Sequence, residues 1–110
     1  MPTVTIYFAK NEKPVVSKDF IPQLKDLLVK ELSCGEIALT PEEISVRLVH
    51  ADGGGMIADI ELEIAAHAFG ERIKKQDVIC NTVRQFVLKE LPHIRDARVW
   101  LQLSELGHSW

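Results

Sequence analysis

The chain has few of the residues that build disulfide scaffolds and metal centres. Its two cysteines, Cys34 and Cys80, are far apart in the sequence and form neither a Cys-x-x-Cys pair nor a Cys/His ligand pattern. The four histidines show no ligand spacing either. We therefore expect two reduced, half-buried thiols, no metal site and no cofactor.

An excess of positive charge and long apolar segments are also lacking. The formal net charge of −3 argues against a nucleic-acid partner that is bound through counterion release. No apolar run is long enough to span a bilayer, and no charged-then-apolar leader precedes the first expected strand. We expect a soluble, cytoplasmic protein without a membrane partner.

What the chain does contain is enough apolar material for one small core. It has 110 residues, of which 46% are hydrophobic. This length is typical of a single domain, and we expect residues 1–110 to form one.

Four stretches alternate between apolar and polar residues, which is the period of half-buried strands. They are residues 1–8, 44–50, 58–69 and 97–104. In the first of them, Val4, Ile6 and Phe8 share one face. Each strand therefore has an apolar face that can pack against a single layer of helices.

Two longer stretches repeat apolar residues at helical spacing. The first begins near Ser17 or Asp19, either of which can cap it, and ends at Gly35, which suits a left-handed cap. The second follows Gly70, and Pro92 stops it.

The order of these elements is strand, helix, strand, strand, helix, strand. It predicts an α+β fold in which two helices cover one face of a four-stranded mixed sheet. One βαβ unit occurs twice, in residues of about 2–50 and 58–104, although residue identity between the two halves is weak. The strands within each unit should pair in parallel.

The other face of the predicted sheet is mostly polar. It holds Thr3, Thr5, Tyr7, Ser45, Arg47, Asp59, Glu61, Glu63, Arg98, Trp100 and Gln102. Such a face can meet solvent, or it can line a channel or interface when several subunits face one another. Arg47 either binds a substrate or pairs with Glu61 or Glu63, and Tyr7 and Trp100 either line a pocket or pack an interface.

Pro2 precedes the first strand and is a candidate base. If Met1 is removed, the nitrogen of Pro2 becomes a free secondary amine at the rim of the sheet. An N-terminal amine has a pKa of about 8, and burial or nearby cations lower it toward neutrality. The simpler interpretation is a proline that starts a strand, where its missing N–H costs nothing.

These features resemble the tautomerase superfamily, which includes 4-oxalocrotonate tautomerase (4-OT), 5-carboxymethyl-2-hydroxymuconate isomerase and macrophage migration inhibitory factor (MIF). The resemblance rests on Met1-Pro2, on the duplicated βαβ unit, and on Ile44-Ser-Val-Arg-Leu48 after Thr40-Pro41-Glu42-Glu43. It implies a MIF-like fold and a homotrimer whose three sheets face inward. It also implies cofactor-independent tautomerase or isomerase activity.

By this resemblance, Pro2 is the catalytic base that moves a proton between the carbon and oxygen of a small keto or enol acid. Arg47 matches the strand arginine that binds the acid end of the substrate. Single-unit members carry a further arginine in the corner after their first strand. In this chain, the corresponding corner of the second unit carries Arg72. With Tyr7 and Trp100 on the polar face, the predicted substrate-binding residues are Arg47, Arg72, Tyr7 and Trp100.

Two other hypotheses remain open from the sequence. One is a tautomerase-like protein without catalysis that serves as a structural or interaction protein. The other is a ferredoxin-like module that binds a small ligand on the open face of an antiparallel sheet, because that fold has the same order of elements.

Overall fold

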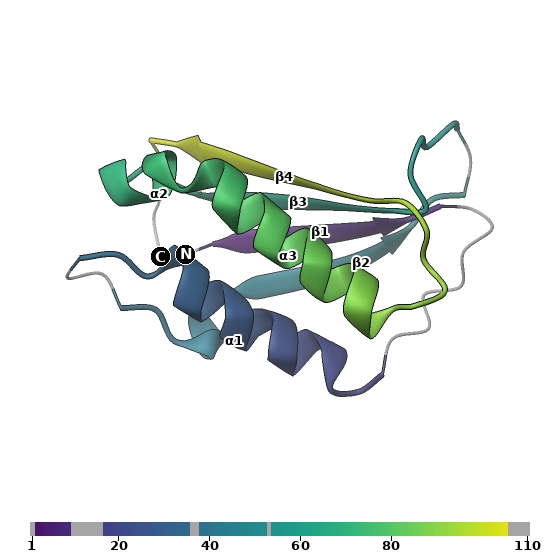
Figure 1. Cartoon of the computed structure of the whole chain (residues 1–110), viewed down its shortest axis with the longest axis horizontal. Coiled ribbons are helices and arrows are strands. Elements are labelled where there is room, and N and C mark those ends of the chain that lie inside the picture. Colours follow the sequence, from purple (N-terminus) through teal and green to yellow (C-terminus); the bar gives the residue numbers. More distant parts are fainter. Residues whose placement is uncertain (1, 10–16, 36–37, 53, 106–110) are drawn as a thin grey trace.

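Two layers make up the computed structural model, with helices on one side and a four-stranded sheet on the other (Figure 1). It describes residues 2–9, 17–35, 38–52 and 54–105. Along the chain the elements are β1 (Thr3–Phe8), α1 (Phe20–Leu32), the short 3-10 helix η1 (Pro41–Glu43), β2 (Ser45–His50), β3 (Ile60–His67), α2 (Gly70–Lys74), α3 (Gln76–Glu90) and β4 (Ala97–Ser104).

The strand order across the sheet is β2-β1-β3-β4. β1 pairs with β2 in parallel, β3 pairs with β4 in parallel, and β1 and β3 meet antiparallel at the centre. The expected mixed sheet and the parallel pairing inside each βαβ unit are therefore confirmed. The antiparallel sheet expected for a ferredoxin-like module is not what the described strands form.

The core lies between the sheet and the two long helices. Val4, Ile6 and Phe8 of β1 are at most 1% exposed, as the two-residue alternation predicts. Burying one such side chain contributes about 2 kcal/mol. They pack with the apolar face of α1 and the inner face of α3 in one cluster. From the helices, the fully buried members of this cluster are Phe20, Leu24, Leu28, Leu32, Ile79, Val83 and Val87.

The ends of the elements differ in places from the sequence expectation. α1 ends at Leu32, and the next residue, Ser33, is already extended (φ −67°, ψ 135°). Gly35 does have positive φ (52°) but lies beyond this end, so it turns the following loop and does not cap the helix. At the other end, the N–H of Phe20 donates to the backbone oxygen of Ser17. The capping hydrogen bond there therefore comes from backbone and not from a side chain.

The second predicted helix is divided into α2 and α3. The break falls at Lys75, whose backbone (φ −105°, ψ 9°) departs from helical geometry. The apolar stripe from Ile79 onward lies wholly on α3. The short helix α2 is therefore not continuous with α3, and its direction allows the side chain of Arg72 to be buried in the protein.

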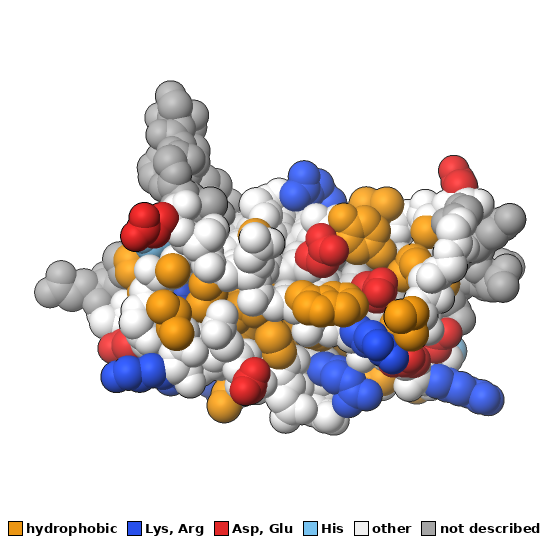
Figure 2. Space-filling view, turned by 90° about the horizontal axis from the view of Figure 1, so that it is seen from above, with side chains coloured by type: hydrophobic (Ala, Val, Ile, Leu, Met, Phe, Trp, Pro, Cys, Tyr) orange, Lys and Arg blue, Asp and Glu red, His pale blue; other side chains and the backbone are white. Residues whose placement is uncertain are grey.

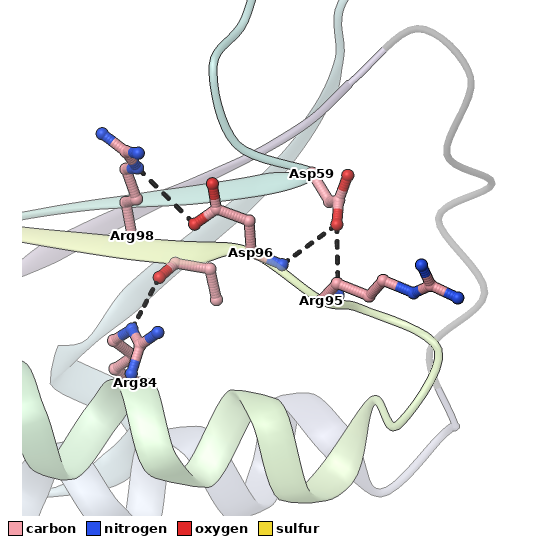
Figure 3. A network of polar contacts seen from close by, with 6 residues as sticks. Asp59, Arg84, Arg95, Asp96 and Arg98 are labelled. Carbon is pink, nitrogen blue, oxygen red and sulfur yellow. Dashed lines mark hydrogen bonds and ion pairs between the residues drawn. The ribbon is translucent and has the colours of Figure 1, made fainter.

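Asp59 anchors the loop before β4 instead of facing outward with the polar residues of β3. Its carboxylate accepts hydrogen bonds from the N–H groups of Arg95 (3.1 Å) and Asp96 (3.0 Å), as Figure 3 shows. Asp96 in turn forms an ion pair with Arg98 (3.5 Å). The strand predicted from the sequence began at residue 58, which put Asp59 on its polar face. β3 begins at Ile60, and Asp59 belongs to the corner before it.

Replacing Asp59 by alanine is expected to lower the free energy of unfolding by about 1–2 kcal/mol, because two backbone N–H groups lose their acceptor. Urea denaturation measures the change. Asp52→Ala is the matched control, since Asp52 is an exposed loop aspartate. Equal losses in the two variants would contradict the anchoring role.

Candidate functional site

The open face of the sheet, which is the face away from α1 and α3, is hollowed. The hollow has a volume of about 680 Å³ and draws residues from all four strands. It is lined by Thr3, Thr5, Tyr7, Arg47, Glu61, Glu63, Ile64, Ala65, Trp100, Leu101 and Gln102. Seen from the β4 side, acidic, basic and hydrophobic side chains are interspersed on the surface (Figure 2).

Strand register arranges the side chains of the open face in three rows across the sheet. The central row is Arg47, Thr5, Glu63 and Trp100, on β2, β1, β3 and β4 respectively. One flanking row is Ser45, Thr3, Ala65 and Gln102, and the other is Val49, Tyr7, Glu61 and Arg98. Because neighbouring strands lie about 4.8 Å apart, the backbones at Arg47 and Glu63 are separated by about 10 Å.

The local fold sets the place of Arg47. Before β2, the backbone N–H of Thr40 donates to Oε1 of Glu43 (3.0 Å), which fixes η1. β2 then starts at Ser45, whose N–H donates to the carbonyl oxygen of Pro2 (3.2 Å). This pairing brings Arg47 opposite Thr5 of β1.

Three of the predicted substrate-binding residues, Arg47, Tyr7 and Trp100, line this one hollow. Arg47 is exposed, Tyr7 is half-buried, and Trp100 is 48% exposed. Among the described residues, the structure gives no ion pair for Arg47, and the single ion pair there joins Arg98 to Asp96. The alternative that Arg47 pairs with Glu61 or Glu63 is therefore not found, and its guanidinium is available to a ligand.

Arg72 lies elsewhere, inside the protein. It is 3% exposed. Its Nε donates to the carbonyl oxygen of Leu32 (2.8 Å) and its guanidinium also donates to the carbonyl oxygen of His67 (2.9 Å). The guanidinium carbon lies 4.8 Å from the ring centre of Phe69. Burial lowers the pKa of Arg72, and the nearby Cys34 sulfur acts in the opposite direction.

The structure therefore does not bring Arg72 to the hollow. The physical reason is the break between α2 and α3, which turns this side chain toward the ends of α1 and β3. There its hydrogen bond to Leu32 links the second βαβ unit to the first, and its hydrogen bond to His67 stays within the second unit. We assign it a structural role.

Pro2 directly precedes Thr3, which belongs to one of the flanking rows. Its side chain is buried, and its carbonyl oxygen holds the start of β2. Thr3 lines the hollow, whereas Pro2 itself does not belong to the lining. Met1 lies outside the described residues. Pro2 is therefore the chain neighbour of a lining residue and is not itself part of the hollow.

Sequence reasoning did not identify the central row as a unit. The alternation showed that Thr5, Glu63 and Trp100 share a face, but the pairing between β1 and β3 decides which side chains lie next to one another. No short-range signal in the sequence specifies that pairing. Glu63 is thereby placed between Thr5 and Trp100, in the same row as the unpaired Arg47.

The two cysteines are free and half-buried, as expected. Burial raises the pKa of the Cys80 thiol, with a further contribution from Asp77, so Cys80 stays protonated at neutral pH and is a poor nucleophile. In the described part of the chain, no three His, Cys, Asp or Glu side chains gather in a way that could hold a metal ion. The helices of the same part are too short or too polar to cross a membrane.

Comparison with known proteins gives a match in structure and none in sequence. Neither a family model nor a curated protein sequence matches the chain. Solved structures do match along nearly its whole length. The MIF from Oncomelania hupensis has a TM-score of 0.69 and 13% identity, covering 98% of this chain and 92% of that one.

Two further matches are enzymes or enzyme assemblies by their descriptions. A fused 4-OT described as an asymmetric trimer has a TM-score of 0.67 and 13% identity, covering 97% of this chain and 92% of that one. A 5-carboxymethyl-2-hydroxymuconate delta-isomerase has a TM-score of 0.64 and 13% identity, covering 100% of this chain and 85% of that one. The chain has the fold shared by these tautomerase-superfamily structures, as its sequence pattern predicted.

Proposed function

We propose that this protein is a cofactor-independent tautomerase or isomerase that interconverts the keto and enol forms of a small keto acid. The observation that supports the proposal is Arg47, which has no ion pair among the described residues and lies in a polar hollow that is also lined by Thr3, the residue after Pro2. The shared fold with 4-OT and with the delta-isomerase supports the same class of reaction.

In the proposed mechanism, the substrate carboxylate binds the guanidinium of Arg47 by charge-assisted hydrogen bonds. With Met1 removed, the amine of Pro2 takes a proton from the carbon next to the carbonyl group. The electron pair of that C–H bond moves onto the carbonyl oxygen, and Arg47 stabilises the negative charge that develops there. The protonated amine then returns the proton to the oxygen or to another carbon, so no external reactant is needed.

Tyr7 and Trp100 complete the proposed site. Both line the hollow, and their rings offer apolar surface against which a bound substrate can pack.

We also propose a homotrimer with the open faces turned inward. β2 and β4 are the edge strands of the sheet, and β2 is exposed at nearly every residue. An exposed edge with apolar side chains such as Leu48 (44% exposed) and Val49 (39% exposed) is a template for pairing with another chain. Assembly would cover Trp100 and close the hollow to water, which strengthens its electrostatic interactions. With two reduced thiols, the protein is proposed to act in the cytoplasm.

The proposal predicts that Arg47→Gln lowers kcat/KM for a straight-chain 2-keto acid by about 10- to 100-fold, because a charged hydrogen bond contributes about 1.5–3 kcal/mol. The measurement is NMR of hydrogen–deuterium exchange at the carbon next to the carbonyl. Lys89→Gln is the matched control, since Lys89 is exposed on α3, on the helix layer. Arg47→Lys should recover part of the loss.

A second substrate tests whether Arg47 binds the carboxylate. A simple ketone should lose less rate in Arg47→Gln than the keto acid does, because it has no carboxylate for Arg47 to bind and loses only the stabilisation of its developing oxyanion. An equal loss for the ketone and the keto acid would contradict carboxylate binding.

A second candidate, a trimer without catalysis, is favoured by one observation. Pro2 is buried and does not line the hollow. This candidate predicts a trimeric mass in solution and no exchange on any keto acid.

A further inference from the structure

The charges of the hollow are not those expected for a site that binds acids alone. Its lining contains one basic side chain, Arg47, and two acidic side chains, Glu61 and Glu63. The nearby Arg98 pairs with Asp96 and does not line the hollow, so it offsets this excess only in part. A dicarboxylate would bring two more negative charges into this lining.

The two acidic residues have different surroundings. Glu61 lies beside Arg98 in the β3–β4 register, so a positive charge is close to it. Glu63 lies between Thr5 and Trp100, neither of which carries a charge. Within the described part of the chain, the structure gives Glu63 no hydrogen bond or ion pair. Glu63 is exposed, and its carboxylate is therefore free to accept a ligand.

Arg47 and Glu63 are a pair of unpartnered, opposite charges in the same row. Their backbones are about 10 Å apart, with Thr5 between them. The two side chains line the same hollow and form no ion pair with each other, so a ligand can contact both. Such a ligand places a carboxylate at Arg47 and a cation at Glu63.

Trp100 adds a second cation-binding feature at the same place. It is the register neighbour of Glu63 on β4 and is 48% exposed. The face of an indole ring attracts cations through its quadrupole, most strongly among the aromatic side chains. A carboxylate beside an exposed indole is a combination that favours a quaternary or primary ammonium group over a neutral one.

We infer that the substrate is a zwitterion: a keto acid that carries an ammonium group at the end away from its carboxylate, recognised by Glu63 and Trp100. This inference rests on the proposed function, since it names the substrate class for the same site. Glu63 determines specificity and takes no part in the proton transfer.

The test uses three straight-chain 2-keto acids of matched length. The first ends in a trimethylammonium group, the second in the uncharged tert-butyl isostere, and the third in a carboxylate. The quaternary ammonium group is chosen because a primary amine on such a chain would cyclise onto the ketone. Binding to the full-length protein is measured by NMR titration, and turnover by deuterium exchange in the same samples.

Wild-type protein is expected to bind the trimethylammonium compound about three- to tenfold more tightly than its isostere, the effect of one exposed ion pair and one cation–π contact. In Glu63→Gln this ratio should fall but stay above one, because the ion pair is lost and the cation–π contact with Trp100 remains. Glu90→Gln, an exposed change on α3, should keep the wild-type ratio.

Three results would overturn the inference: a ratio that is the same in Glu63→Gln as in wild type, tighter binding of the compound with two carboxylates, or no binding of the trimethylammonium compound. Cation-selective binding without deuterium exchange would support the inference while rejecting the proposed function. Deuterium exchange on all three compounds without a preference for the cation would support the proposed function and reject the inference.

Discussion

Protein that keeps Met1 is expected to exchange the proton of a keto acid about 10²- to 10⁴-fold more slowly than protein from which Met1 has been removed. This is the usual contribution of a positioned general base. A proline nitrogen joined to Met1 is a tertiary amide and has no basic lone pair. The fold keeps residue 2 beside the start of β2 in either case, since its carbonyl oxygen accepts a hydrogen bond from the N–H of Ser45. The two forms therefore differ in their chemistry and keep the same sheet.

Intact mass spectrometry separates the two forms, and deuterium exchange by NMR gives their rates. Pro2→Ala without Met1 is an informative companion, because it keeps a free amine but loses the rigid ring. Its rate should fall between those of the two forms. Equal rates with and without Met1 would rule out Pro2 as the base and favour a trimer without catalysis.

Arg72→Met is expected to lower the free energy of unfolding by about 3–6 kcal/mol, the largest effect on stability that we predict. The change removes two hydrogen bonds from a charged group, each of which contributes about 1.5–3 kcal/mol. It also leaves the carbonyl oxygens of Leu32 and His67 without these donors. The cation–π contact with Phe69 is lost as well.

Urea denaturation measures this loss, with Lys74→Met as the control. Lys74 lies on the same short helix, α2, and is exposed, so its replacement should change stability by less than about 0.5 kcal/mol. If Arg72 bound substrate instead, Arg72→Met would slow the deuterium exchange of the keto acid, and its free energy of unfolding would equal that of wild type.

The fold could be predicted from the sequence because the residue patterns that indicate its strands and helices are local. Alternation over a few residues shows which side of β1 carries Val4 and Ile6, and helical spacing shows which side of α3 carries Ile79 and Val83. Parallel pairing within each unit follows from the long connection between its strands. These features need no knowledge of distant contacts.

The site depends on distant contacts, and the sequence predicted less of it. Arg47, Tyr7 and Trp100 were assigned to the correct face, but their grouping with Glu63 required the register between β1 and β3. Arg72 was predicted to bind substrate because it occupies the corner of the second unit at which the resemblance implies an arginine. Its burial follows from the break at Lys75 and from the free carbonyls at the ends of α1 and β3, which no local pattern reveals.

The position of β1 has a consequence for the order of events during synthesis. β1 is made first, yet it pairs with Ser45–His50 on one side and with residues 60–65 on the other. It cannot be completed until more than half of the chain has left the ribosome. Pro2 is buried once the sheet is formed. The bond that precedes Pro2 is therefore exposed to an aminopeptidase on the nascent chain for as long as β3 has not yet been made.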